Sequence, residues 1–303
     1  MELSQLKTFV TVAEEAHLTR AAERLFTSQP AISAQLKALE ESLGVLLFDR
    51  TPKGMRLTPA GETLLVQAKI TLDAAGNMLN KARAIQGEIW GSLSVGVNSD
   101  YEFLRITDLL KATHACHAGI QLSFYQGMTP DILQDIRKGK LDSGFYFGPC
   151  QVSDLHVQPL AQVKTAIVAP AAWADKVEHA TLEQLANLPW IYTTQRCPFV
   201  PIVEKILSTA AKQIAKVVYV DHEDAIRHFI KAGAGIALLR EDDAIRAESE
   251  GWGTRWHNPT PPIALSVAVL SRRLQEPLIR AWLDILQTLW PATADSGMCR
   301  EAG

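Results

Sequence analysis

The stretch LTRAAERLFTSQPAISAQLKALEESLGVLLFDRTPKGMRL, residues 18–57, decides the fold of the first part of the chain. It predicts two short helices joined by a tight turn, then an apolar segment and a basic loop. Ser28 is a typical N-cap, and Pro30 falls in the first helical turn, where its missing N–H costs no hydrogen bond. The second helix has one apolar face, with residues spaced by four, three and four: Ile32, Leu36, Leu39 and Leu43.

The other face of this second helix carries short polar side chains near its N-terminus. Such a helix suits the major groove, where Gln29, Ser33 and Lys37 would approach bases while Ser28 and the loop cations contact phosphates. The predicted DNA-binding residues are Thr27, Ser28, Gln29, Pro30, Ser33, Ala34, Lys37, Arg50, Lys53 and Arg56. The last three lie within seven residues around a Pro/Gly turn, as in a wing that faces phosphates; a solvated hairpin is the alternative reading.

The run AAERLFTSQPAISAQLKALEESLGVLLFDR (21–50), followed by LTPAG (57–61), resembles the N-terminal domain of LysR-type transcriptional regulators. The resemblance implies a multi-domain chain: an all-α winged helix-turn-helix domain, a long linker helix, and an α/β effector domain of two lobes. That effector domain would be similar to a type 2 periplasmic binding protein. Ala34 and Lys53 stand where arginine is frequent in the family, a difference that bears on sequence preference.

The composition describes a globular chain of 303 residues, with 47% hydrophobic and 21% charged residues. Net charge is −3, and residues 1–58 hold seven basic and seven acidic residues. The charge balance alone therefore does not indicate that the chain binds a nucleic acid. No apolar run approaches the roughly 20 residues of a membrane span, and the N-terminus lacks a signal-peptide pattern. We expect a protein of the bacterial cytosol and nucleoid, without a membrane partner.

A long helix is predicted from Thr58-Pro59 to about Gln86. It carries a heptad seam of small and large apolar residues: Leu65, Ala68, Leu72, Ala75, Leu79 and Ala82. A domain of about 60 residues cannot bury such a helix, so we expect a homodimer through this seam and a partly palindromic DNA site. The alternative is a helix packed on its own effector domain. The resemblance also implies tetramers.

After residues 87–91, short strands alternate with helices, which favours parallel sheets covered on both faces. Strands are predicted at 92–97, 120–125, 144–147, 166–170, 189–194, 216–220, 235–239 and 265–270. Helices are predicted at 101–114, 129–139, 181–187, 201–212, 223–232 and 277–290. The expected division is 1–58 (DNA-binding), 59–88 (linker) and 91–303 (effector domain). The resemblance implies one lobe from about 91–161 with 266–290, and a second from about 162–265.

Ligands of such sheets bind beyond the carboxyl ends of the strands. That rule selects the effector-binding candidates Ser99, Asp100, Gln126, Thr129, Phe147, Thr194, Arg196, Cys197 and His222. Ser99 and Thr129 each stand at a predicted helix start, where they either cap the helix or help to hold a carboxylate. Arg196 is the one cation in the selected loops: pointing inward it favours an anionic effector, and pointing outward it is a surface residue.

The four cysteines are expected to be reduced thiols. Cys150 and Cys197 sit in loops that could face each other, so a redox-responsive regulator is the alternative function; the paired spacing of the family's peroxide-sensing branch is absent. Histidine spacing predicts no metal site, and no catalytic constellation or cofactor motif is present. We therefore expect a regulator and no enzyme, with promoter DNA, an effector, a second copy and, for an activator, RNA polymerase as partners. A cytosolic solute-binding protein or an enzyme is the further alternative.

Overall fold

The computed structural model describes residues 1–51, 54–85, 89–208, 216–220 and 222–291. The chain divides into two compact units, Met1–Ile89 and Trp90–Gly303. Each unit is built around its own buried apolar residues. Among the described helices, none is long and apolar enough to cross a membrane.

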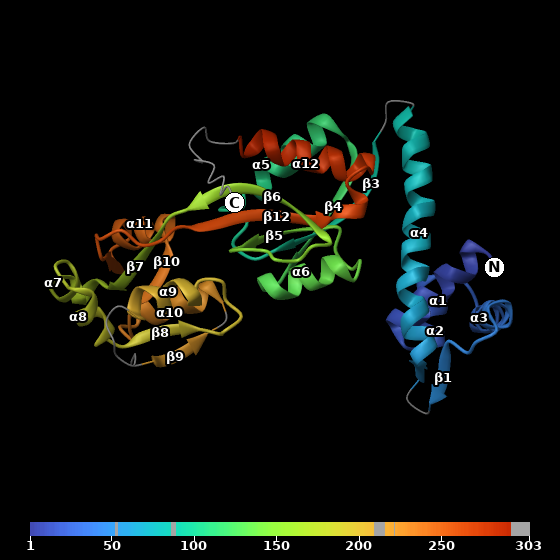
Figure 1. Cartoon of the computed structure of the whole chain (residues 1–303), viewed down its shortest axis with the longest axis horizontal. Coiled ribbons are helices and arrows are strands. Elements are labelled where there is room, and N and C mark those ends of the chain that lie inside the picture. Colours follow the sequence, from blue (N-terminus) through green and yellow to red (C-terminus); the bar gives the residue numbers. More distant parts are fainter. Residues whose placement is uncertain (52–53, 86–88, 209–215, 221, 292–303) are drawn as a thin grey trace, which may run out of the picture. The chain divides into compact units, whose positions relative to one another are not determined.

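The first unit is a helical domain with a small hairpin (Figure 1). Its elements are α1 (Leu3–Glu15), α2 (Leu18–Arg24), α3 (Gln29–Leu43), β1 (Phe48–Thr51), β2 (Gly54–Leu57) and α4 (Pro59–Ile85). The predicted apolar face of α3 is confirmed, because Ile32, Leu36 and Leu39 are buried in the core with Phe9 and Phe48. The rings of Phe9 and Phe48 pack edge to face, with centroids 5.6 Å apart.

The predicted seam of α4 divides into two parts. Ala68 is buried in the core of the first unit, and Leu65 and Leu72 pack against that core. Of the predicted seam residues, Leu79 in the later part of the helix is 58% exposed, and the neighbouring Met78 is 68% exposed. The expectation that the whole seam awaits a partner is therefore wrong for its first half.

The second unit contains two lobes. The first lobe consists of β3 (Trp90–Val97), α5 (Ile106–Cys116), β4 (Gly119–Gln126), α6 (Thr129–Arg137), β5 (Ser143–Phe147), β6 (Leu155–Val163), β12 (Ile263–Leu270), η2 (Ser271–Arg273) and α12 (Pro277–Leu289). Its sheet has the order β4-β3-β5-β12-β6. Helices α5 and α12 lie on one side of the sheet and α6 on the other (Figure 1). Gly96 and Gly144 permit this close packing, because a Cβ on either would meet Ile132 of α6 within 3 Å.

The second lobe is made of shorter elements. These are β7 (Thr165–Pro170), η1 (Ala171–Trp173), α7 (Ala174–Val177), α8 (Leu182–Ala186), β8 (Trp190–Thr193), α9 (Val200–Ser208), β9 (Lys216–Val220), α10 (Glu223–Lys231), β10 (Ala237–Arg240), α11 (Glu241–Ser249) and β11 (Gly253–Arg255). They form a sheet of order β10-β7-β11 and the pair β8-β9.

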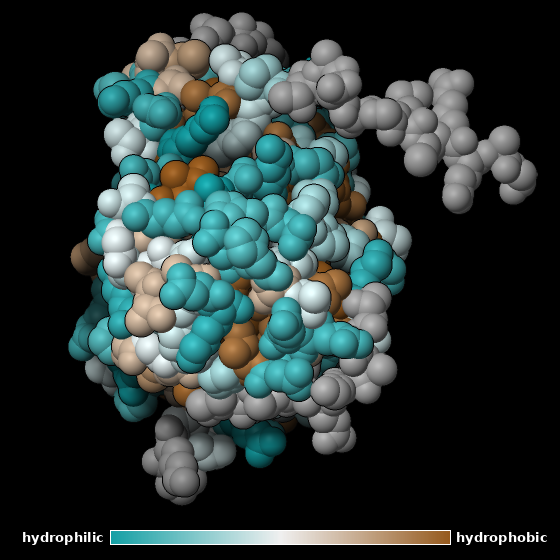
Figure 2. All heavy atoms as spheres, turned by 90° about the vertical axis from the view of Figure 1, so that its left-hand side faces the viewer, coloured by the Kyte–Doolittle hydropathy of each residue, from teal (hydrophilic) through white to brown (hydrophobic). Residues whose placement is uncertain are grey.

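The face of the molecule in Figure 2, the left-hand side of Figure 1, is largely hydrophilic with small separate hydrophobic patches.

The prediction of all-parallel sheets is wrong in part. Strand β3 is parallel to β4 and β5, but β12 is antiparallel to β5 and β6, and β7 is antiparallel to β10 and β11. In the first lobe, the antiparallel pairs are those of β12, which returns to this sheet after the whole second lobe has been traversed. Strands β6 and β11 and helices α7 and α11 were not predicted. The helix expected from residue 101 begins only at Ile106.

Candidate functional site

The N-terminus of α3 presents an exposed polar surface. Ser28 is its N-cap, as predicted, and its hydroxyl accepts a hydrogen bond from the Ala31 N–H at 3.4 Å. Of the predicted DNA-binding residues on this helix and its cap, Ser33 is half-buried and the others are exposed: Thr27, Ser28, Gln29, Pro30, Ala34 and Lys37. Lys37 is 78% exposed, and only a 3.7 Å ion pair with Glu41 holds its ammonium group. This surface is open to a nucleic acid.

The hairpin β1–β2 is fixed to the helices by hydrogen bonds. A carboxylate oxygen of Glu40, on α3, accepts from the N–H groups of Leu47 at 2.7 Å and Phe48 at 3.3 Å. On the other strand, the Met55 N–H donates to the Ala16 carbonyl at 2.8 Å. Arg56 is exposed on β2, whereas Lys53 and the side chain of Arg50 lie outside the described residues. The hairpin is held where a wing would lie beside a reading helix.

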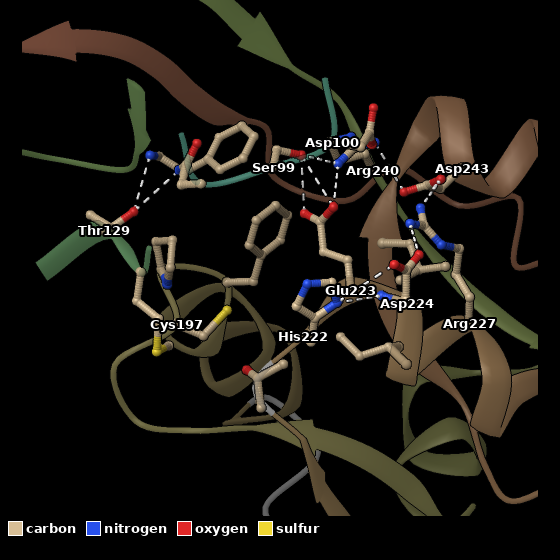
Figure 3. Close-up of a pocket in the computed structure, with 18 of the residues that line it drawn as sticks. Ser99, Asp100, Thr129, Cys197, His222, Glu223, Asp224, Arg227, Arg240 and Asp243 are labelled. Carbon is tan, nitrogen blue, oxygen red and sulfur yellow. Dashed lines mark hydrogen bonds and ion pairs between the residues drawn. The ribbon is translucent and has the colours of Figure 1, made fainter. Parts of the chain in front are cut away.

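The second unit holds a cavity of about 500 Å³ between its lobes. It brings together seven of the nine predicted effector-binding residues: Ser99, Asp100, Gln126, Thr129, Phe147, Cys197 and His222. Thr194 and Arg196 do not line it. Figure 3 shows Thr129 and Cys197 at one end and the charged cluster around Arg240 at the other. The strand-end rule therefore located most of the cavity.

Arg240, the last residue of β10, is the centre of the charged end. Its side chain is 1% exposed. Five hydrogen bonds leave its guanidinium: to Ser99 at 2.5 Å, Asp100 at 2.6 Å, Glu223 at 2.8 Å, and Asp242 at 3.0 and 3.1 Å. A guanidinium has five N–H groups, so all of them have acceptors. Because Ser99 and Asp100 belong to the first lobe, Arg240 joins the lobes through buried charge.

Further polar contacts cross between the lobes around this centre. The Ser99 hydroxyl contacts both Glu223 carboxylate oxygens, at 3.1 and 3.3 Å. The side-chain amide of Gln126 meets the His222 ring at 3.2 Å. Arg246 of α11 lies 3.4 Å from Glu102. The lobes are held together by polar groups, several of which line the cavity.

Two predicted roles need correction. Ser99 does not cap a helix, because α5 begins at Ile106 with Arg105 as its N-cap. Thr129 is the first residue of α6 and Met128 is the N-cap. The Thr129 hydroxyl instead accepts from the Asn98 amide at 3.3 Å and the Phe147 N–H at 3.4 Å. Ser99 and Thr129 both line the cavity.

Arg196, expected to be the cation of the site if it pointed inward, forms an ion pair with Asp131 and is 52% exposed. The cations that do line the cavity are Arg227 and Arg240, which sequence reasoning missed. A signal for Arg240 existed, because it directly follows the predicted strand 235–239. Applying the strand-end rule to that strand would have found it.

Burial and ion pairing change the acidity of this cluster in opposite directions. Burial raises the pKa of Glu223, although the Arg240 guanidinium opposes the shift. For Asp100, burial is outweighed by the Phe103 N–H and Arg240, which together lower its pKa. Arg240 remains charged, since its carboxylate partners raise its pKa despite burial. The cluster thus contains one carboxylate that is poorly stabilised in its charged form and one that is well stabilised.

The carboxylates of Asp100, Glu223 and Asp243 lie close enough together to suggest a cation site. The protein's own cation fills it: the Arg240 guanidinium lies 2.6, 2.8 and 3.2 Å from them, respectively. Cys150 and Cys197 are the two cysteines of the predicted redox alternative. Cys150 packs against the first lobe's core and Cys197 against the second's, and burial raises the pKa of Cys197. A thiol with a raised pKa is a poor nucleophile at neutral pH.

Comparison with known families assigns both units. Residues 3–62 match the bacterial regulatory helix-turn-helix domain of the lysR family, and residues 86–291 match the LysR substrate binding domain. The chain belongs to the LysR family. It is a LysR-type DNA-binding transcriptional regulator with an effector-binding domain.

Individual LysR proteins are similar over nearly the whole chain. The regulator TfdS of Cupriavidus pinatubonensis is 28% identical over 94% of this chain and 97% of its own length. A full-length OxyR from Pseudomonas aeruginosa is 26% identical, with a TM-score of 0.73 over 95% of both chains. Full-length CbnR in complex with its target DNA shares the fold, at 23% identity and a TM-score of 0.65 over 95% of this chain and 99% of its own.

Proposed function

We propose that the cavity between the lobes is the effector site of this regulator, and that its occupancy alters transcription from the bound promoter. The observation that carries the proposal is the Arg240 cluster. Residues of both lobes line the cavity, and Arg240 of one lobe bonds Ser99 and Asp100 of the other. A ligand in this cavity touches the groups that hold the lobes together. Its binding energy can therefore bias the arrangement of the lobes.

The α3 surface and the β1–β2 wing are proposed to bind the promoter. Gln29, Ser33 and Lys37 would approach base edges from the major groove, and Ser28 with the wing cations would contact phosphates. The exposure of Lys37 and Arg56 and the anchoring of the wing through Glu40 support this assignment. The proposed functional division is 1–58, 59–88 and 91–303, with the two lobes as defined above.

Self-association through the later part of α4 completes the proposal. Met78 and Leu79 are exposed there and are suited to a second copy, in a homodimer or a homotetramer. A two-fold dimer reads a partly palindromic site, and an activator would in addition contact RNA polymerase.

Because its target is a bacterial promoter, the regulator acts in the cytoplasm. The chain is no enzyme in this proposal, since the cavity's charged groups are engaged with one another.

The proposal is tested by selecting a duplex from a random DNA pool with the purified full-length chain. A specific sequence should be enriched by the wild type and lost with Ser33→Glu, which places a carboxylate on the reading surface. Ser249→Glu, on the exposed surface of α11, is the matched control and should enrich the same sequence. Equal enrichment by the wild type and Ser33→Glu would contradict the assignment of α3 as the reading helix.

A further inference from the structure

The effector class can be inferred from the charge of the cavity, on the basis of the proposed effector site. Its charged lining consists of four carboxylates and two guanidinium groups: Asp100, Glu223, Asp224, Asp243, Arg227 and Arg240. The surplus is two negative charges, in a partly enclosed space where charges are weakly screened. An anionic ligand would meet net repulsion, and a cationic ligand net attraction.

Both arginines of the cavity are paired with protein carboxylates, and Arg240 has no N–H group left for a ligand carboxylate. Arg240 already directs all five N–H groups at protein acceptors. Arg227 donates to Asp243 and Asp224, both at 2.6 Å. A ligand anion that bound Arg240 would have to displace a protein carboxylate from its partner, and leaving a buried charge unpaired is costly. This arrangement disfavours the anionic effector that an inward-pointing Arg196 would have indicated.

The helix N-termini near the cavity are also compensated. Such termini attract anions when their positive ends are free. Here α10 begins with Glu223 and Asp224, and the Asp224 N–H donates to the His222 ring at 3.3 Å. The first turn of α6 contains Asp131, and three acids open α11. The first turn of each of these helices thus carries the protein's own acids, whose negative charge opposes a ligand carboxylate there.

Hydrogen-bond acceptors remain available beside an apolar wall. Oε1 of Glu223 receives only a 3.3 Å contact from Ser99, and Figure 3 shows Glu223 reaching across from α10 toward Ser99. Oδ1 of Asn98 lines the cavity and is buried without a partner among the described residues. Next to them the rings of Phe147 and Phe199 pack 5.4 Å apart. Acceptors beside aromatic faces suit an ammonium group on an apolar body.

We propose that the effector is an organic cation, a protonated amine carried on an apolar body. The ammonium group lies at the Glu223 and Asp224 end, and the body packs against Phe147 and Phe199. Binding of the ammonium group offsets the negative charge of the cavity, and it breaks no ion pair of Arg240 or Arg227.

The test is calorimetric titration of the full-length chain at pH 7 with benzylamine, benzyl alcohol and benzoate, which share one ring. Benzylamine should bind about tenfold or more tightly than benzyl alcohol, and benzoate most weakly. Glu223→Gln and Asp224→Asn should each weaken benzylamine about tenfold and leave benzyl alcohol unchanged. Asp284→Asn, an exposed acid of α12 outside the cavity lining, is the control and should change neither affinity.

Benzoate binding more tightly than benzylamine, or no measurable benzylamine binding, overturns the cationic effector. Met128→Trp separates this result from failure of the effector site itself, because the larger side chain fills the cavity. If the three probes bind in the wild type but not in Met128→Trp, the site stands and their order decides the charge class. If benzylamine still binds to Met128→Trp with wild-type affinity, the probe sits elsewhere and both proposals fail.

Discussion

The guanidinium of Arg240 lies 2.6 Å from the carboxylate of Asp100, a residue 140 positions earlier in the chain and in the other lobe. The same guanidinium also donates hydrogen bonds to Ser99 and Glu223, so one buried cation connects the loop after β3, the start of α10 and the end of β10. The cavity wall and the contact between the lobes are thus made of the same groups. A ligand bound at the charged end of the cavity would contact the groups that join the lobes, which is how the proposed effector would act on the arrangement of the lobes.

Removing this cation should strongly destabilise the second unit. Arg240→Met leaves Asp100, Glu223 and Asp243 without their shared partner, and we expect a loss of about 3–5 kcal/mol in the free energy of unfolding. Urea unfolding followed by tryptophan fluorescence measures it, because all seven tryptophans lie in the second unit. Arg196→Met is the control: its exposed pair should cost about 0–1 kcal/mol. Similar losses in both variants would contradict the central role of Arg240.

The acidity of Glu223 should appear in the pH dependence of stability. Its folded-state pKa is raised above the ordinary 4.5, so its contribution is fully present below pH 4.5 and lost as the pH rises through the folded value. The lowered pKa of Asp100 acts oppositely: its contribution is present above pH 3.8 and lost as the pH falls through the folded value. Glu223→Gln should flatten the gain in stability between neutral pH and pH 4.5, measured as urea midpoints, whereas Asp100→Asn should retain it.

The wing depends on one glycine. Gly54 has φ of 123°, and a Cβ there would lie 2.4 Å from the Ala16 carbonyl oxygen. Gly54→Ala should therefore destabilise the first unit by about 2 kcal/mol or more, measured by loss of helical circular dichroism on heating. Gly44→Ala is matched, since φ is 71° with open space around the Cβ, and should cost about 1 kcal/mol. Equal costs would mean that the contact with Ala16 is unimportant.

Lys37 should contribute to DNA affinity through its charge. Lys37→Ala removes an exposed cation from α3, so affinity for the selected duplex should fall. If Lys37 contacts a phosphate, the slope of log affinity against log salt should also fall by about one; if it contacts a base, sequence preference should relax. Fluorescence anisotropy over a salt series distinguishes these outcomes. Lys111→Ala, an exposed lysine on α5, should behave as wild type. Unchanged binding by Lys37→Ala would contradict both the phosphate contact and the base contact.

The two halves of α4 should respond differently to charge. Leu79→Asp places a carboxylate on the exposed later part and should lower the molecular mass measured by light scattering, with the helical fold retained. Ala68→Asp buries a carboxylate in the core of the first unit and should instead lower its thermal stability. A full-mass oligomer in Leu79→Asp would rule out this part of α4 as the self-association surface.

The helix-turn-helix part of the first unit could be predicted from residues 18–57, because its structure depends on short-range signals. The Ser28 cap, the spacing of Ile32, Leu36 and Leu39, and the turn at Gly44 all act within a few residues. Most strands of the second unit were also predicted, and their carboxyl ends located the cavity. Strand direction was predicted correctly only in part, because a hydrophobic run shows that a strand is buried and not which neighbour pairs with it.

By itself, the sequence determined the family, the helix-turn-helix and most of the loops that surround the cavity between the lobes. Tertiary structure alone decided which residues meet there. Arg240 lies far from Asp100 along the chain, and only folding brings them to hydrogen-bonding distance. It likewise decided that Leu65 packs on its own core while Leu79 is left exposed. Local patterns specify which face of an element avoids water, but the partner that covers that face, or neutralises a buried charge, comes from distant parts of the chain.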